Sequence, residues 1–253
     1  MKRNQKIIVV MPAYNAEKTI EQTYRDIPKG VADEVIVVDD ASHDRTIAKA
    51  KSLGLRTVTH PKNLGYGGNQ KTCYRTALGR GADIVVMIHP DYQYDATLTG
   101  KMVDPIKRGE YDIMLGSRIR TRAEALSGGM PVWKYAANRF LTIIENIVLS
   151  LNLSEYHTGF RAYSAAALKR LPLEKNSNDF IFDQEILVEA VSQGMRIGEI
   201  PVPVRYFDEA SSINFTRSVV YGLATLGLLM RYLLDRSRII KDPRFAQGRV
   251  HVA

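Results

Sequence analysis

Cysteine is almost missing from this chain. Cys73 is the one cysteine among 253 residues, so an internal disulfide is excluded. Residues 1–6 are too polar to begin a secretion signal, which needs an apolar stretch of about 7–15 residues. Low-complexity tracts and internal repeats are absent too, which excludes fibrous and solenoid classes. We therefore expect a cytoplasmic protein, ordered except at its ends.

The composition fits an ordinary globular protein, with 45% hydrophobic and 25% charged residues. Its length suits one large α/β domain, alone or with a short appendage. We expect a domain over residues 1–216, with one half at about 1–118 and a second half at about 119–216, followed by an apolar helix and basic tail over 217–253. The net charge of +8 favours anionic partners, which include nucleic acid, phosphorylated substrates and acidic membranes.

Short apolar runs rich in β-branched residues alternate with helical patterns in the first half of the chain. This alternation predicts a parallel sheet built from βαβ units. The expected strands are 7–11, 34–38, 55–59, 84–88 and 112–115, and the expected helices are 16–27, 44–53, 68–80 and 96–108.

Polar side chains follow each of these five runs, where a buried strand has no need of them. They are Pro12, Tyr14 and Asn15 after the first run, Asp39 and Asp40 after the second, His60 and Asn63 after the third, His89, Asp91 and Gln93 after the fourth, and Ser117 and Arg118 after the fifth. Ligands of open α/β sheets bind at the carboxyl ends of the strands. We therefore expect these groups to converge on one crevice.

The pattern changes after Gly116. Residues 135–151 read as a long apolar helix, and 156–163 as a polar segment centred on Thr158-Gly159-Phe160-Arg161. Residues 196–206 read as an edge strand, because they contain two prolines. Proline has no backbone N–H to donate, so it is found in edge strands rather than in strands that are hydrogen-bonded on both sides. We expect this half to form the acceptor side.

Two segments offer ligands for a nucleotide and a cation. Asp39-Asp40 places carboxylates where they could hold ribose hydroxyls, a base edge or a divalent ion. Helix capping explains the nearby Ser42 and Asp44 equally well, but it does not explain the two aspartates.

His89, Asp91 and Gln93 alternate in sequence, so in an extended segment they face the same side. One ion bridging a diphosphate would suit them, since Mg²⁺ and Mn²⁺ keep waters and take substrate phosphates. A simple turn at Pro90-Asp91 is the alternative.

Other candidates carry weaker signals. Asn63-Leu64-Gly65-Tyr66-Gly67-Gly68 could bring backbone amides to a phosphate, or it could be a plain loop. Arg118 and Arg161 lie in Gly-containing segments and could clamp phosphate oxygens, although surface arginines are common. Asp183 and Glu185 follow aromatic residues and could act as a base, or they could be ordinary acids at a helix N-terminus.

Taken together and in order, these residues resemble family 2 glycosyltransferases of the GT-A fold, most closely the branch of dolichyl- and polyprenyl-phosphate sugar synthases. The resemblance covers residues 7–206. The matching pieces are Met11-Pro12-Ala13-Tyr14-Asn15 with Ile20, residues 35–40 with Ser42 and Asp44, Asn63-Leu64-Gly65-Tyr66-Gly67, Asp91 and Gln93, Gly116-Ser117-Arg118, and Thr158-Gly159-Phe160-Arg161. It implies a Rossmann-like, mostly parallel sheet flanked by helices, with a C-terminal helical appendage.

The resemblance also implies roles. A nucleotide sugar, UDP- or GDP-linked, would contact Pro12, Ala13, Tyr14, Asn15, Asp39, Asp40, Asn63, Gly67, His89 and Arg118. Mg²⁺ or Mn²⁺ would be held by Asp91 and Gln93 with His89. The acceptor would meet Thr158, Arg161 and Arg205, and the catalytic set would be Asp91, Arg118 and Asp183. The reaction would invert the anomeric centre, with the metal stabilising the leaving diphosphate, in the assembly of a cell-envelope glycan.

Two positions depart from the family pattern. The usual metal motif is Asp-x-Asp, and here His89 replaces the first acid, so Asp91 must carry most of the metal binding. Relatives often have a basic residue near 209–214, where this chain has none, and Arg205 could substitute.

Alternative functions remain open at this point. A soluble hydroxyl or polysaccharide acceptor would need a general base, such as Asp183 or Glu185, whereas a lipid phosphate is already anionic. A non-catalytic nucleotide-sugar-binding subunit is a further possibility, because the metal motif has lost one acid. A nucleic-acid partner is not expected, and a homo-oligomer is possible.

The segment 218–234 is nearly all apolar. Its uncharged core, residues 219–230, is shorter than the roughly 20 apolar residues that span a bilayer, and Arg231 interrupts any extension. Basic residues flank it, namely Arg217, Arg231, Arg236, Arg238 and Lys241. We expect it to lie on an acidic membrane surface or to pack within this protein or an oligomer.

Overall fold

The computed structural model describes residues 5–119, 130–203 and 215–245. The strands are β1 (Ile7–Ala13), β2 (Glu34–Asp39), β3 (Arg56–Thr59), β4 (Ile84–Ile88), β5 (Ile113–Ser117), β6 (Phe160–Ser164) and β7 (Ile197–Pro201). The helices are α1 (Ile20–Arg25), α2 (Thr46–Ser52), α3 (Tyr66–Gly79), α4 (Thr99–Lys107), α6 (Val132–Leu149), α7 (Ala165–Arg170), α8 (Phe182–Ser192) and α9 (Phe215–Arg236), with short 3₁₀ turns at Ala96–Leu98 and Leu173–Lys175.

The strands form one sheet in the order β3-β2-β1-β4-β6-β5-β7. All neighbours pair in parallel except β6, which runs antiparallel to both β4 and β5. The expected α/β class with a mostly parallel sheet is confirmed, and β7 lies at the edge as its prolines predicted. The five expected strands lie within about two residues of their predicted bounds.

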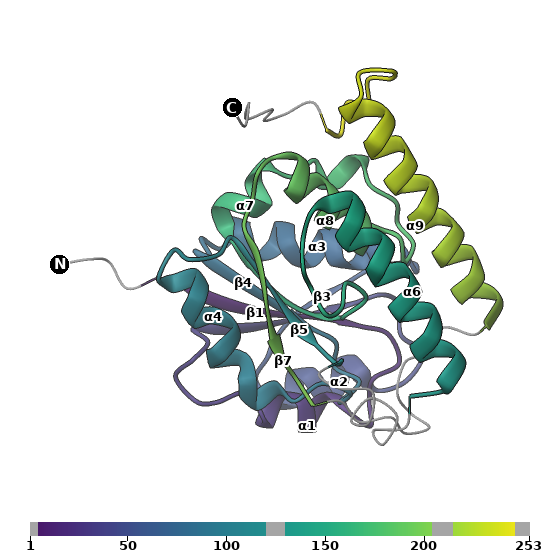
Figure 1. Cartoon of the computed structure of the whole chain (residues 1–253). Helices are drawn as coiled ribbons and strands as arrows, with labels where there is room; N and C mark the ends of the chain where they lie inside the picture. Colours follow the sequence, from purple (N-terminus) through teal and green to yellow (C-terminus); the bar gives the residue numbers. More distant parts are fainter. Residues whose placement is uncertain (1–4, 120–129, 204–214, 246–253) are drawn as a thin grey trace.

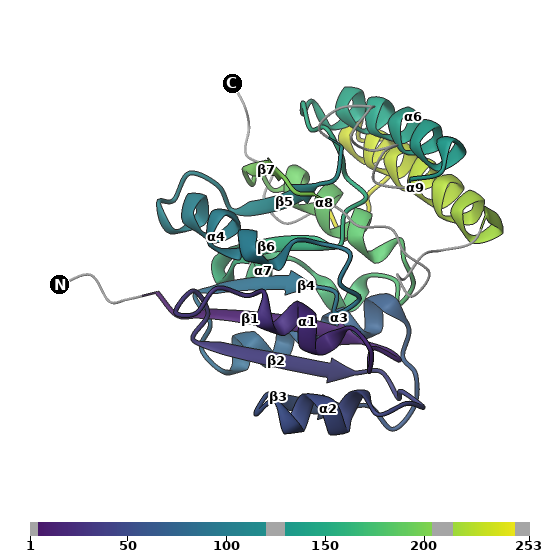
Figure 2. The same cartoon turned by 90° about the horizontal axis from the view of Figure 1, so that it is seen from below.

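Helices cover both faces of the sheet (Figures 1 and 2). α1, α2 and α4 pack on one face, and α3, α7 and α8 pack on the other. Every residue of β1 is buried, because alternate side chains enter one or the other of these two layers. A strand covered on both faces reads as a continuous apolar run, which is why the sequence revealed it.

Strand β6 was not predicted. The segment containing Thr158-Gly159-Phe160-Arg161 read as a polar turn, whereas Phe160–Ser164 is a strand inside the sheet. Arg161, which gave the segment its polar character, is fully buried there. A charged residue in a central strand is misleading when its partners lie elsewhere in the chain.

The C-terminal helix α9 lies beside α6, and it also contacts α8 (Figures 1 and 2). Its segment Thr216–Arg236 is long and apolar enough, by length and composition, to cross a membrane. The uncharged core of this helix, residues 219–230, is shorter because Arg231 interrupts it. The buried side of the helix carries Leu228, Leu229 and Tyr232, which belong to the hydrophobic core.

Candidate active site

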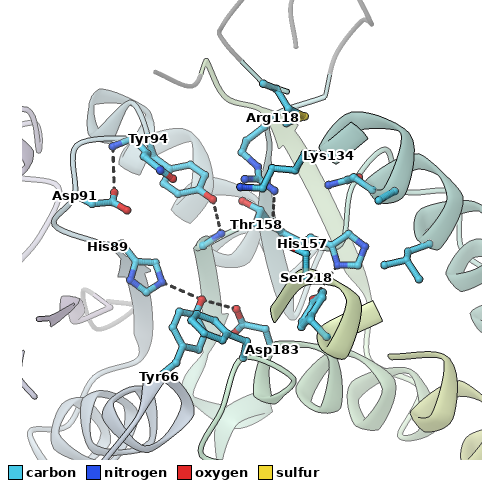
Figure 3. A pocket seen from close by; sticks show the side chains of 18 of the residues that line it. Tyr66, His89, Asp91, Tyr94, Arg118, Lys134, His157, Thr158, Asp183 and Ser218 are labelled. Atoms are coloured by element: carbon cyan, nitrogen blue, oxygen red, sulfur yellow. Dashed lines mark hydrogen bonds between the residues drawn. The ribbon is translucent and has the colours of Figure 1, made fainter. Parts of the chain in front are cut away.

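A pocket opens at the carboxyl ends of β4 and β5, between α6, α9 and the start of α8 (Figure 3). Its wall includes six of the residues expected from the sequence, namely His89, Asp91, Gln93, Arg118, Thr158 and Asp183. Tyr66, from the Asn63–Gly68 segment, also lines it. Residues that the sequence had not singled out complete the wall, among them Lys134, His157 and Tyr221.

Asp91 lies just beyond β4, and its Oδ1 accepts the backbone N–H of Gln93 at 3.1 Å. Burial raises the pKa of Asp91, while the neighbouring His89 and Arg118 act in the opposite direction. A cation beside the Asp91 carboxylate would favour its charged form and so offset the effect of burial on its pKa. The described part of the chain holds no cluster of three or more Asp, Glu, His or Cys side chains that could bind a metal. An ion held by Asp91 and Gln93 would therefore take its other ligands from water and a diphosphate, as Mg²⁺ and Mn²⁺ commonly do.

His89 is held by its neighbours rather than pointed at Asp91. Its Nε2 lies 3.0 Å from the hydroxyl of Tyr66, which donates to Asp183 Oδ2 at 2.7 Å. Burial lowers the pKa of His89, against a hydrogen bond to the backbone of Pro12 that raises it. A metal bond from Nε2 would require the Tyr66 contact to break, and the role of His89 as a ligand beside Asp91 stays a prediction.

Gly159 gives the His89 ring its room. A Cβ at this position would lie 2.5 Å from His89 Cδ2, closer than real side chains approach. The backbone N–H of Gly159 also donates to the hydroxyl of Tyr94 at 2.7 Å. The glycine of the Thr-Gly-Phe-Arg segment is therefore required by packing around the imidazole.

Tyr66→Phe tests whether this chain of contacts supports the site. Loss of the hydroxyl removes a partner from both His89 and Asp183, and we expect transfer activity to fall about 10- to 100-fold, as for other residues that orient site groups. Tyr156→Phe is the matched control, because it also deletes a buried hydroxyl, bonded to Asn146 Oδ1 at 2.8 Å, but outside the pocket. Equal steady-state kinetics for the two variants would show that Tyr66 only fills space.

Asp183 lies in the first turn of α8 and is almost fully buried. Its Oδ1 accepts from Gln70 Nε2 at 3.0 Å, and its Oδ2 accepts from Tyr66 and lies 3.5 Å from Arg161 Nη2. Both oxygens are thus engaged, which does not suit the expected base. Glu185 lies outside the pocket wall, where it accepts from Ser177 N at 2.7 Å and pairs with Arg244 at 2.8 Å.

Arg161 does not reach the pocket. From within β6 its guanidinium donates to the backbone carbonyls of Thr158 at 2.7 Å, Asp183 at 3.0 Å and Tyr156 at 3.0 Å. The resemblance implied that Arg161 meets the acceptor, whereas in this structure its donors face the protein interior.

Arg118 follows β5 and lines the pocket, as expected. Its Nε donates to Glu155 Oε1 at 2.8 Å, its Nη2 contacts the same oxygen and the carbonyl of His157, and its backbone N–H donates to Glu155 Oε2 at 2.7 Å. Lys134 of α6 lines the same wall, and its pKa is lowered by burial and by the charge of Arg118. Two cations thus share this corner with one buried acid.

The residues expected on the nucleotide gather at a neighbouring edge, beyond β1, β2 and β3. Pro12 and Ala13 end β1, and Tyr14 beyond them is 51% exposed. Asn15 has a positive φ of 54°, donates its N–H to Ser42 Oγ and accepts from His43 N through Oδ1 at 2.9 Å. These residues do not line the pocket described above.

The paired aspartates hold loops together. Asp39 accepts from the N–H and hydroxyl of Ser42, and Asp40 accepts from the N–H groups of Leu64 and Gly65 at 2.8 and 3.0 Å. His60 Nδ1 also lies 2.7 Å from Asp40. Both carboxylates are nearly inaccessible, so in this conformation they shape the nucleotide edge.

The loop after β3 is fixed in the same way. Asn63 donates to the carbonyl of Asp40 at 3.2 Å, and Gly67 donates to the carbonyl of Asn178 at 2.8 Å. A Cβ on Gly67 would lie 2.6 Å from the Ser177 carbonyl, so the glycine permits close packing. Arg205 and residues 209–214 lie outside the described residues.

Comparison with known proteins agrees with this geometry. The model of the family described as glycosyl transferase family 2 matches residues 8–171. The chain belongs to this family. A UDP-N-acetylglucosamine–dolichyl-phosphate N-acetylglucosaminyltransferase of Methanococcus voltae is 29% identical to it over 217 residues, covering 79% of this chain and 86% of the relative. An undecaprenyl-phosphate mannosyltransferase of Micrococcus luteus is 25% identical over 207 residues, covering 78% and 82%.

Solved structures show the fold of this family 2 glycosyltransferase. Glucosyl-3-phosphoglycerate synthase of Mycobacterium tuberculosis, bound to UDP, superposes with a TM-score of 0.69 at 22% identity, covering 91% of this chain and 81% of that one. The expected GT-A fold with a C-terminal helix is confirmed. The same synthase has been solved with Mn²⁺, UDP-glucose and phosphoglyceric acid, with a TM-score of 0.68.

Proposed function

We propose that this glycosyltransferase moves a sugar from a UDP- or GDP-linked donor to a polyprenyl or dolichyl phosphate, with inversion at the anomeric carbon. The observation that carries the proposal is the corner formed by Arg118 and Lys134 against one buried acid, Glu155. A phosphate entering this corner would meet an excess of positive charge and the planar donors of an arginine.

The candidate bases favour the same acceptor. A hydroxyl acceptor needs a general base, yet both oxygens of Asp183 accept hydrogen bonds and Glu185 lies outside the pocket. A phosphate monoester is anionic at neutral pH and can attack without one. The names of the relatives in Methanococcus voltae and Micrococcus luteus, which act on lipid-linked phosphates, support this choice.

The two substrates would then bind at different parts of the site. The nucleotide would lie beyond β1–β3, and its diphosphate would reach Asp91 and Gln93, which would hold Mg²⁺ or Mn²⁺. When bound, the ion neutralises charge that develops on the leaving diphosphate. An oxygen of the acceptor phosphate forms the new bond to the anomeric carbon as the bond to the diphosphate breaks, and the nucleoside diphosphate departs. Arg118 and Lys134 hold the attacking phosphate.

A panel of acceptors tests the proposal. The enzyme is incubated with UDP- and GDP-sugars, Mn²⁺ and either polyprenyl phosphate, the matching polyprenol or phosphoglyceric acid, and products are separated by chromatography. We expect transfer to the lipid phosphate alone. Transfer to polyprenol or to phosphoglyceric acid would refute the acceptor, and a lack of both transfer and donor hydrolysis would indicate a binding subunit.

Arg118→Lys is expected to raise the KM for the acceptor about 10- to 100-fold, with a smaller change in kcat. Lysine cannot keep its contacts with Glu155 and His157 while also offering two parallel donors to a phosphate, and charge-assisted hydrogen bonds contribute about 1.5–3 kcal/mol. Arg139→Lys in α6 is the control, since Arg139 donates to the Ser154 carbonyl at 2.7 Å outside the pocket. A wild-type KM in Arg118→Lys would place the phosphate elsewhere.

A further inference from the structure

Helix α6 buries several polar side chains and exposes several large apolar ones. Its buried residues include the polar Asn138, Thr142 and Glu145, while Phe140, Ile143 and Ile147 are 58%, 53% and 73% exposed. A surface helix normally turns its apolar stripe to the core. Exposing large apolar side chains on one stripe costs stability unless something covers them.

The inward polar residues of α6 serve the candidate site. Asn138 Nδ2 donates to Glu155 Oε1 at 2.9 Å, and Glu155 holds Arg118. Glu145 lies 3.1 Å from His157 Nε2 in the pocket wall. The inward polar residues therefore contact groups of the candidate site. The apolar residues on the opposite side of the helix face outward as a consequence.

Helix α9 extends the same surface. It lies beside α6 (Figures 1 and 2). It also exposes large apolar side chains. We call the combined surface the apolar face, and it consists of Val132, Trp133, Phe140, Ile143 and Ile147 of α6 with Val219, Val220, Leu223, Met230 and Leu233 of α9. Scattered apolar residues need no explanation, but ten on two adjacent helices indicate a contact surface.

The charges around this face have one sign. Across α6, α9 and the described residues that follow, the exposed charged side chains are all basic, namely Arg217, Arg231, Arg236, Arg238 and Lys241. The acids of the same segments, Glu145, Asp235 and Asp242, are buried. In a symmetric dimer through this face the basic residues of two copies would be brought together, which opposes association. An acidic bilayer complements both the apolar stripe and its basic flanks.

The face also adjoins the pocket. Trp133, Ala137 and Leu141 of α6 and Ser218 and Tyr221 of α9 line the pocket wall. Figure 3 shows Ser218 of α9 in this wall. A surface pressed against a bilayer would thus bring the membrane next to the pocket, where an acceptor phosphate would have to arrive.

We propose that α6 and α9 together dock the enzyme on an acidic bilayer, lying along its surface with the apolar face entering the boundary between headgroups and acyl chains. α9 does not cross, because its other side is packed on the protein through Thr225, Leu229 and Tyr232. The docking rests on the proposed function, in which the acceptor is a lipid phosphate. Binding to a bilayer can be measured separately, without turnover.

Flotation of the full chain with vesicles tests the docking. Wild type is expected to float with phosphatidylcholine vesicles containing phosphatidylglycerol and much less with phosphatidylcholine alone. The triple variant Phe140→Gln, Ile143→Gln and Ile147→Gln, whose new residues are polar and favour helix, should lose at least tenfold in vesicle affinity. Arg236→Glu with Lys241→Glu should lose a similar factor, since each basic residue near an acidic surface contributes about 1 kcal/mol.

A charge-matched control separates this face from net charge. Lys101→Glu with Lys107→Glu in α4, on the side of the molecule away from α9, makes the same charge change and should float as wild type does (Figure 1). Circular dichroism and thermal unfolding confirm that each variant is folded. The proposal would be overturned if the wild-type protein stayed in the unbound fraction. It would also be overturned if the triple variant, the Arg236 and Lys241 variant and the Lys101 and Lys107 control all floated equally.

Two readouts distinguish the remaining outcomes. With a short-chain, water-soluble isoprenyl phosphate the triple variant should turn over as wild type does, and with acceptor in vesicles it should be slower. Wild type that floats but transfers no sugar to either acceptor refutes the proposed function and leaves the docking intact. A dimer by light scattering that the triple variant converts to monomer would make a second copy the occupant and overturn the docking.

Discussion

Asp91→Ala is expected to leave a folded protein that has lost roughly 10³-fold or more of its transfer rate. Asp91 is the one carboxylate of the expected metal motif, since His89 stands at the first position with Nε2 on the Tyr66 hydroxyl. Without Asp91 the ion would lose its charged protein ligand, and the growing charge on the diphosphate would not be neutralised. Chelation of divalent ions by EDTA should reduce the wild type to a similar rate, while the variant should respond little.

Asp95→Ala provides the control for Asp91→Ala. Asp95 lies in the same loop and accepts from its own i+2 backbone N–H, that of Thr97 at 3.1 Å, as Asp91 does from Gln93. It does not line the pocket. Its loss should cost about 1 kcal/mol of capping and leave kcat and the metal response unchanged. An Asp91→Ala enzyme with most of its activity, or a wild type indifferent to EDTA, would exclude the metal-dependent reaction.

The donor half of the fold was predictable because its signals are local. β1, β2 and β4 are covered on both sides and read as apolar runs, and the polar groups that follow them mark the carboxyl edge of the sheet. The roles of those groups were harder to predict. Asp40 looked like a ligand for a nucleotide, but its carboxylate is engaged by N–H groups of Leu64 and Gly65, some 25 residues later.

The acceptor half carries few local signals. Lys134, His157 and Tyr221 meet in one pocket although they lie far apart in the chain, so no spacing could have grouped them. The inverted burial of α6 has another cause. The segment read from the sequence as a long apolar helix. The inward position of Asn138 and Glu145 depends on their contacts with Glu155 and His157, which lie outside the helix.

Arg161 shows most sharply why one segment was misread, and it gives the largest expected effect on stability. β6 lies between β4 and β5, and Arg161 pairs across to Met87 and Leu115. Its guanidinium joins three backbone carbonyls and the Asp183 carboxylate. Arg161→Met keeps much of the apolar volume but leaves Asp183 buried with one cation fewer. We expect the free energy of unfolding to fall by about 3–5 kcal/mol, as when one partner of a buried ion pair is removed.

Urea unfolding of Arg161→Met, Arg161→Lys and a control measures this loss. Arg170→Met is the control, because Arg170 is exposed at the end of α7 and donates to the Gln193 carbonyl at 2.9 Å. It should cost less than about 1.5 kcal/mol. Arg161→Lys should be nearly as harmful as Arg161→Met, because an ammonium cannot reach three carbonyls placed for a planar guanidinium. Combining Arg161→Met with Asp183→Asn should destabilise less than the sum of the single changes, since the double variant no longer buries an unpaired carboxylate. Additive losses, or a wild-type midpoint for Arg161→Met, would show that Arg161 does not serve as the cation for Asp183.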